Sequence, residues 1–293
     1  MAEKPKRWGV GSNQYRKRPG VARPTSNQRT ESAFPLPSST TAPFDERSEA
    51  TGITWDSSAL DLSAFKEMSI EQALARFRSR LSDHVWDAAA LEGNPFTLPE
   101  VQTLLGGVTV GGHRLADEQQ IVALAESSKH VAHLVETERF ALVKNVSDSI
   151  HELVARHEAI ESGHFRGEGS ARGGGLVRLG EWGEYQATET EEGGENLIDE
   201  YHSAVDYLTD NIDHPAEQAM GYFMVGAYRQ FYSGGNKRTS RLNMNGHLLS
   251  NGFDAISIPA ARRLEFNEYL RLLYVEKDGT ALIAFISDCL PTE

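Results

Sequence analysis

The clearest pattern in the chain is a helical one that begins near residue 69. Apolar residues recur there at spacings of three and four, which keeps side chains on one face of an α-helix. Ser69 and Gln72 form a capping box at its start, and Gly93 is a typical stop signal. The spacing therefore predicts an amphipathic helix from residue 69 to about Gly93. Its stripe consists of Ile70, Leu74, Phe77, Leu81, Val85 and Ala88.

Similar patterns predict that most of the remaining chain is helical. Thr97 and Glu100 make a second capping box ahead of further apolar positions. Strand-like alternation is nearly absent outside the glycine-rich stretch 163–183, where residues 176–179 are the best candidate for one arm of a hairpin. We therefore predict a mainly α fold with one short β-hairpin. Further helical spacings cover 116–138, 146–161, 195–210, 215–229, 238–251, 260–274 and 280–290.

Charge divides the chain into a basic leader and an acidic body. Residues 1–30 contain eight Lys or Arg and one acid, and six of the eleven prolines precede residue 50. Because residues 1–30 sum to +7 and the whole chain to −13, the other 263 residues carry −20. Proline and basic residues with few large apolar side chains predict a disordered leader over 1–55. The acidic body argues against nucleic acid as the main ligand, because phosphate binding needs positive surface.

The cysteine count and the longest apolar runs limit the compartment and the kind of site. The single cysteine, Cys289, excludes an intrachain disulfide and zinc sites with two thiolates. No apolar run reaches about 18 residues, and the start lacks the apolar core of a signal peptide. His130 and His133 lie three apart on a predicted helix, and we interpret them as ordinary helix histidines. We therefore predict a cytoplasmic protein without membrane contact and without a dedicated metal site.

A glycine-rich loop between two predicted helices carries the strongest chemical signal. The helix 215–229 ends, Gly234 and Gly235 follow, and a new helix begins near Arg238. Loop amides at a helix N-terminus attract anions. Arg238 and Arg241 lie on one face of that helix, where their guanidinium forks suit separate phosphates. The residues alone predict a nucleotide-phosphate site, although a polar turn between helices has the same appearance.

The same loop resembles the signature of the Fic/Doc family. That pattern is His-x-Phe-x-(Asp/Glu)-(Gly/Ala)-Asn-(Gly/Lys)-Arg-x-x-Arg, and residues 235–241 read Gly-Asn-Lys-Arg-Thr-Ser-Arg. Upstream, residues 88–94 are similar to the family's inhibitory helix, with Ala88 where Ser or Thr is usual. The resemblance spans about 69–260 and implies a Fic-like helical bundle with a β-hairpin flap. Such proteins transfer AMP from ATP to a hydroxyl of a target protein. Two further matches are Gly163-His164-Phe165-Arg166 before the flap and His214-Pro215 opening the helix into the motif.

The resemblance also implies roles for individual residues. Asn236 and Arg238 act at the catalytic centre by holding phosphates, and Arg241 holds the γ-phosphate. Glu92 inhibits by pairing with Arg241, and the flap aligns the target backbone by strand addition. The implied nucleotide-binding residues are Gly234, Gly235, Asn236, Lys237, Arg238 and Arg241. The implied flap residues are Val177, Arg178 and Leu179.

Two positions depart from the family pattern. Counting back from Asn236, Gln230 stands at the His position and Gly234 at the acid position. A shift of one residue places Arg229 at the His position and aligns Phe231, yet residues 229–241 contain no His, Asp or Glu in either register. Losing a general base typically costs about 10²–10⁴ in rate. We therefore predict ATP or another nucleotide as ligand, Mg²⁺ without its usual acidic ligand, and weak or altered activity.

Other readings of the sequence stay open at this point. A non-catalytic Fic-like module would bind a partner protein through flap and leader. A Doc-like kinase rests on Lys237 alone. The expected partners are a nucleotide and an unknown target protein, and a homodimer is possible because helical Fic-like proteins often pair. The predicted organisation is a leader over 1–55, an N-terminal helical region with the inhibitory helix over 56–112, and a Fic-like core with C-terminal helices over 113–293.

Overall fold

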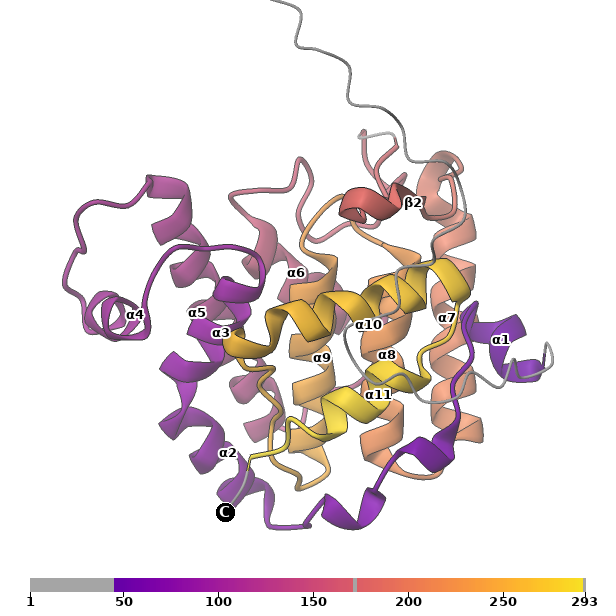
Figure 1. Cartoon of the computed structure of the whole chain (residues 1–293), viewed down its shortest axis with the longest axis horizontal. Coiled ribbons are helices and arrows are strands. Elements are labelled where there is room, and N and C mark those ends of the chain that lie inside the picture. The colour runs from indigo at the N-terminus through magenta and orange to yellow at the C-terminus, as the bar shows by residue number, and fades with distance from the viewer. Residues whose placement is uncertain (1–44, 171–172, 292–293) are drawn as a thin grey trace, which may run out of the picture. The chain divides into compact units, whose positions relative to one another are not determined.

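Helices make up nearly all regular structure in the part of the chain that the computed structural model describes, residues 45–170 and 173–291 (Figure 1). These residues belong to one compact unit. The early helices are α1 (Glu46–Thr51), α2 (Ile70–Ser79), α3 (Leu81–Leu91), α4 (Leu98–Leu105), α5 (Leu115–Glu136) and α6 (Lys144–Ala155). The later helices are α7 (Glu195–Asn211), α8 (Pro215–Arg229), α9 (Asn236–Ser250), α10 (Arg263–Glu276) and α11 (Thr280–Ser287).

The centre of the fold is the helix pair α8 and α9. Helices α5 and α6 pack against α9, while α7, α10 and α11 pack against α8 (Figure 1). The two helices can approach closely because Gly226 has no side chain. A Cβ atom at this position would lie only 2.1 Å from the Ser240 hydroxyl oxygen. Met220, Phe223 and Leu248 on these helices are fully buried. The loop that joins α8 to α9, which carries the Fic-like signature, is therefore held at the end of the most buried part of the fold.

Local capping signals correctly located two helix starts. The capping boxes predicted at Ser69 and at Thr97 are both present, ahead of α2 and α4. The stripe predicted as one helix is broken at Arg80, where the backbone leaves the helical region (φ −106°, ψ 16°). The break lets the two halves face different partners, because Phe77 packs in one hydrophobic cluster with α5 and α6, and Val85 packs in another with α4 and α5.

A strap over residues 45–56 ties the beginning of the described chain to its last helices. Thr54 N–H donates to Lys277 O at 2.9 Å, and Gly279 N–H donates to Thr54 O at 2.8 Å. Trp55, itself buried, donates from its indole N–H to Glu217 Oε1 on α8 at 2.9 Å. These ordered residues lie within the segment predicted as a disordered leader, so that prediction extended about ten residues too far. The rest of the leader, 1–44, lies outside the described residues.

The glycine-rich stretch contains the predicted hairpin, which we call the flap. Its strands are β1 (Leu176–Arg178) and β2 (Glu184–Gln186), paired antiparallel with Val177 opposite Tyr185. Tyr185 packs against Tyr228 of α8 and Tyr274 of α10, with ring centroids 5.1 and 5.0 Å apart. The flap is thereby fixed to the central helices, and the predicted class, mainly α with one β-hairpin, is confirmed. Within the described range, no helix has both the length and the apolar character that crossing a membrane requires.

Candidate functional site

The α8–α9 loop has a fixed shape because its ends and its middle are bonded to one another. Gln230 closes α8 in the left-handed region (φ 51°, ψ 55°), and Gly235 opens α9 at φ 69°. Asn236 accepts from the Tyr232 amide at 2.8 Å and donates to the Tyr232 carbonyl at 2.7 Å. The same side-chain amide of Asn236 donates to Gln230 Oε1 at 3.0 Å. Two residues predicted to be catalytic, Gln230 and Asn236, are thus in contact and both shape the loop.

His151 on α6 packs against this loop and supports it, a role that the sequence pattern did not indicate. Its ring stacks on Tyr232 with centroids 3.7 Å apart, and its Nε2 lies 2.9 Å from Gly234 O. Because the Gly163 amide donates to Nδ1 at 2.9 Å, Nε2 must carry the proton and donate to Gly234 O. Burial lowers the pKa of His151 to about 4. The ring is therefore neutral and acts as a rigid brace of the loop.

This brace predicts a pH-dependent stability. Folded His151 stays neutral down to about pH 4, whereas the unfolded chain protonates near pH 6.5, so the unfolded state binds more protons as pH falls through this window. For one such histidine, the free energy of unfolding drops by about 2 kcal/mol between pH 7.5 and pH 5. Urea unfolding at both pH values should show this drop, and His151→Gln should show a drop smaller by about that amount. An unchanged pH dependence in the variant would contradict this role.

Arg166 connects the loop to the flap. Its backbone N–H donates to Phe231 O at 2.8 Å, and its Nε donates to Gln230 O at 2.6 Å. Its Nη2 donates to Thr188 O, 3.1 Å away and just past the flap. Gly175, at φ 74°, lies against the same guanidinium, since a Cβ there would be 2.8 Å from Cζ. Arg166 therefore positions the signature loop and the base of the flap together.

The flap residues differ in how they face the protein. Val177 and Leu179 are partly buried and pack against the core, so their side chains help to anchor the flap. Arg178 is 86% exposed and lies 3.8 Å from Glu184 on the paired strand. In the described part of the chain, β1 pairs with β2 alone.

Three cations at the start of α9 meet two carboxylates from other elements. Glu92, at the end of α3, lies 3.4 Å from Lys237 Nζ and 3.4 Å from Arg241 Nη2. Arg238 instead pairs with Glu158, which follows α6, through Nη1–Oε1 and Nη2–Oε2 contacts of 2.7 and 2.5 Å. Burial favours a higher pKa for Glu92, but Lys237 and Arg241 outweigh it and hold that pKa below its usual value. Both carboxylates are therefore charged at neutral pH and offset most of the positive charge.

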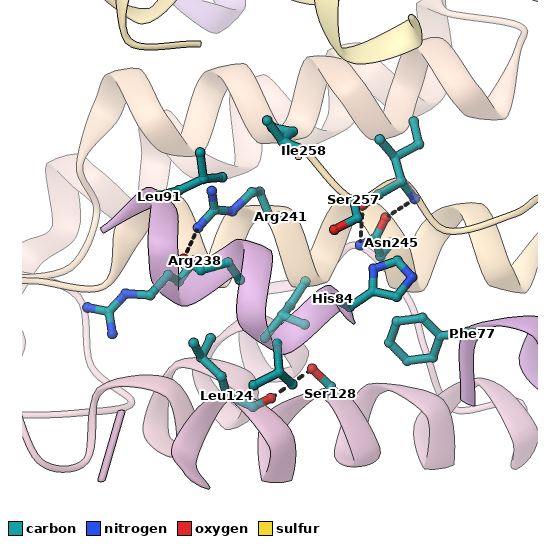
Figure 2. A pocket seen from close by; sticks show the side chains of 14 residues that line it. Phe77, His84, Leu91, Leu124, Ser128, Arg238, Arg241, Asn245, Ser257 and Ile258 are labelled. Carbon is teal, nitrogen blue, oxygen red and sulfur yellow. Dashed lines mark hydrogen bonds between the residues drawn. The ribbon is translucent and has the colours of Figure 1, made fainter. Parts of the chain in front are cut away.

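Arg241 is buried beneath α3 beside a small cavity. The cavity, of about 30 Å³, lies between α3, α5 and α9, and Arg241 extends toward Leu91 along its edge (Figure 2). Arg241 Nε and Nη1 are buried and have no hydrogen-bond partner among the described residues. A space of this size holds about two water molecules and is too small for a nucleotide.

The alternative register is not supported by where its side chains lie. Arg229 donates from Nε to Thr51 O at 3.1 Å and pairs with Glu200 at 3.1 Å, so it is engaged with α1 and α7. Phe231 is buried and stacks on Phe165 at 5.0 Å. Gln230, by contrast, contacts Asn236 within the loop. No group of three His, Cys, Asp or Glu side chains able to hold a metal ion occurs among the described residues.

Similarity to known proteins covers most of the chain. A protein adenylyltransferase Fic of Aedes aegypti is 28% identical over 210 residues, which are 70% of this chain and 39% of that protein. A protein of the same name from Drosophila willistoni is 26% identical over 249 residues, covering 84% of this chain and 46% of the relative. The chain thus spans less than half the length of these curated relatives. No family model matches it.

Solved structures agree with the sequence relatives on the fold. A Fic-1 fragment from C. elegans superposes with a TM-score of 0.60 at 18% identity, covering 83% of this chain and 66% of the fragment. A Fic domain containing signaling protein from Bacteroides thetaiotaomicron gives a TM-score of 0.59 at 20% identity, covering 78% of this chain and 88% of that one. The chain is similar in sequence to Fic adenylyltransferases and shares the fold of Fic-domain structures. The predicted Fic-like bundle with a β-hairpin flap is thereby confirmed.

In this Fic-like chain, sequence reasoning found the loop but missed its supports. The structure brings Glu92 to Arg241, as the resemblance implies, and also to Lys237, and it places Arg238 on Glu158. His151 and Glu158 lie more than 75 positions from the loop residues that they contact. The helical spacing of 146–161 gave no signal of either contact, because periodicity reports which face is buried and not what that face meets.

Proposed function

We propose that this chain is a nucleotide-binding Fic protein that transfers AMP from ATP to a hydroxyl group of a target protein, slowly and under restraint by Glu92. The observation that carries this proposal is the meeting of Lys237 and Arg241 with Glu92 at the N-terminus of α9. A helix N-terminus with converging cations suits a polyphosphate. The curated relatives that match most of this chain are named protein adenylyltransferases, which supports the same reaction.

The loop residues fit the phosphates of ATP. The first turn of α9 has backbone amides without intrahelical partners, and its dipole favours a negative charge. Arg241 has two buried nitrogens, Nε and Nη1, whose N–H groups have no partner among the described residues, which makes an incoming oxyanion a suitable acceptor. Glu92 lies between these groups and the loop, so we infer that it must move before a phosphate can take its place.

The same residues do not fit Mg²⁺. Gly234 has no side chain, and its carbonyl already accepts from His151. Residues 229–241 supply no carboxylate, although magnesium usually takes one or two. We therefore derive no step through a metal ion.

Proton removal is the step for which the loop is least equipped. In AMP transfer the target hydroxyl oxygen attacks the α-phosphorus, the bond to the oxygen bridging to the β-phosphate breaks, and pyrophosphate leaves. The hydroxyl proton must pass to a base. Gln230 has no useful basicity, and its side chain is bonded to Asn236 and to Ala227 O. The proposed reaction is therefore slow, and its rate rests on positioning and charge.

Nucleotide binding should appear as thermal stabilisation that depends on Glu92. We expect ATP or ADP to raise the Tm of Glu92→Gly more than that of the unaltered protein. A ligand present at 100 times its Kd adds about 2.7 kcal/mol, which is about 5–10 °C for a domain of this size. The shift should be lost when Arg241→Ala is added to Glu92→Gly. Differential scanning fluorimetry with ATP, ADP and adenosine measures it.

The absence of His, Asp and Glu from residues 229–241 favours one competing function, a non-catalytic protein-binding module. No Tm shift with ATP or ADP in either protein would support that module and contradict our proposal. A label that is transferred from γ-labelled but not from α-labelled ATP would support the Doc-like kinase instead.

A further inference from the structure

The two arginines of the signature differ in how well they are already paired. Arg238 makes a two-pronged contact with Glu158 at 2.7 and 2.5 Å, and its side chain is only 6% exposed. Arg241 contacts Glu92 through one nitrogen at 3.4 Å and leaves Nε and Nη1 unpartnered. Arg238 therefore has the stronger internal ion pair, although the family resemblance implied a restraint on Arg241 and none on Arg238.

The Glu158 carboxylate occupies the N–H groups of Arg238 that phosphate oxygens would need. A guanidinium fork binds a carboxylate and a phosphate through the same parallel N–H groups, so the two anions compete for Arg238. Burial works to raise the pKa of Glu158, but Arg238 outweighs it and holds that pKa below its usual value. At neutral pH the carboxylate is charged and is a full competitor.

Glu158 is placed so that it can release Arg238. It lies three residues past the end of α6, and its side chain is 36% exposed. The solvent-exposed carboxylate can turn away by side-chain rotation and be hydrated, whereas buried Arg238 has no such alternative. The pair can therefore open without unfolding a helix.

A short chain of side-chain amides links Glu158 to the end of α3. Gln120 on α5 donates from Nε2 to Glu158 Oε1 at 3.0 Å. Asn94 donates from Nδ2 to Gln120 Oε1 at 3.0 Å and to Asp117 O at 2.9 Å. Asn94 follows Glu92 by two residues, so a displacement of Glu92 would reach Gln120 through this contact.

We propose that Glu158 is a second restraining carboxylate, which holds the Arg238 fork until a polyphosphate displaces it and which is coupled to Glu92 through Asn94 and Gln120. This inference rests on the proposed function, because it names the regulation of the same nucleotide site. It goes beyond a single inhibitory glutamate, since each signature arginine has its own internal anion.

The test compares nucleotide affinity in four proteins: the unaltered chain, Glu158→Gln, Glu92→Gly, and the double variant. Isothermal titration with ATP, and separately with inorganic tripolyphosphate, measures Kd. We expect Glu158→Gln to bind each ligand about tenfold more tightly than the unaltered chain, because a neutral amide competes less well for the fork. The double variant should bind about tenfold more tightly than Glu92→Gly. Glu126→Gln is the matched control, because it removes the same charge from an α5 carboxylate that pairs with Arg156 and should leave Kd unchanged.

A supporting role for Glu158 predicts the opposite sign. If Glu158 only orients Arg238 for the ligand, Glu158→Gln should weaken binding or leave it unchanged, and either result overturns the inference. Gln120→Ala keeps the charge of Glu158 but removes the amide that donates to it. This variant should therefore tighten ATP binding by a smaller factor than Glu158→Gln does. If Glu92→Gly binds ATP and adding Glu158→Gln does not lower the Kd, only the second restraint is rejected. If no variant binds ATP, the double variant included, the proposed function is rejected.

Discussion

Gln230→His combined with Gly234→Asp should raise AMP transfer by about 10²–10⁴-fold, when both changes are made in a chain that already carries Glu92→Gly. The backbone conformation of the loop is compatible with both residues. Gly234 does not have a positive φ, and a Cβ there meets no atom within 4 Å. Gln230 has a φ of 51°, a region that His adopts more readily than most residues. The substitutions restore a base to take the hydroxyl proton and an acid of the type that binds magnesium.

Transfer of label from α-labelled ATP onto protein measures this gain. Gly234→Asn in place of Gly234→Asp is the matched control, because it has the same size without the charge and should keep only the gain due to the base. Adding Arg241→Ala should remove the activity by weakening nucleotide binding. Robust labelling by the unaltered protein would show that the loop does not need a base at position 230, and no labelling by the repaired chain would show that the missing groups are not what limits it.

Arg166→Met should lower the free energy of unfolding by about 3 kcal/mol or more. The side chain is 3% exposed and donates to the carbonyls of Gln230, Thr188 and Arg229, which would be left unpaired inside the protein. A methionine fills much of the space but offers no donor. Gly175 would also lose the flat group against which it packs.

Urea unfolding measures the loss, and hydrogen exchange shows where it acts. Exchange should speed up in the flap and in the signature loop more than in α5. Arg78→Met is the matched control, since Arg78 makes an exposed ion pair with Glu136 and should cost less than about 1 kcal/mol. Equal losses in the two variants would show that Arg166 does not connect flap and loop.

Local sequence signals predicted the helices well and their interruptions poorly. Capping residues such as Ser69 and Thr97 act within one turn, so the sequence contains the whole signal. The break at Arg80 has no such signal, because the apolar stripe continues through it and the two halves differ only in their distant partners. Helix α1 was missed for a related reason, since Thr51 is its one buried residue and no stripe marks it.

The candidate site likewise combines residues that are close in the sequence with contacts between residues that are far apart in it. The signature places Gly235 at the N-cap of α9 and Arg238 and Arg241 within its first two turns, and a short pattern suffices to find them. The anion that Arg238 actually meets comes from residue 158, and the ring beneath the loop comes from residue 151. Such pairings depend on how α6 is docked against α9, which follows from the packing of the entire fold.

The strap over residues 45–56 imposes an order of events during synthesis. Ile53 and Trp55 are buried in the finished protein, yet Thr54 pairs with Lys277 and Gly279, which are translated more than 220 residues later. At about 5–20 residues per second, the ribosome needs roughly 10–45 seconds to bridge that interval. Throughout it, the backbone N–H and C=O of Thr54 lack their final partners. The first described segment is therefore among the last to complete its backbone contacts.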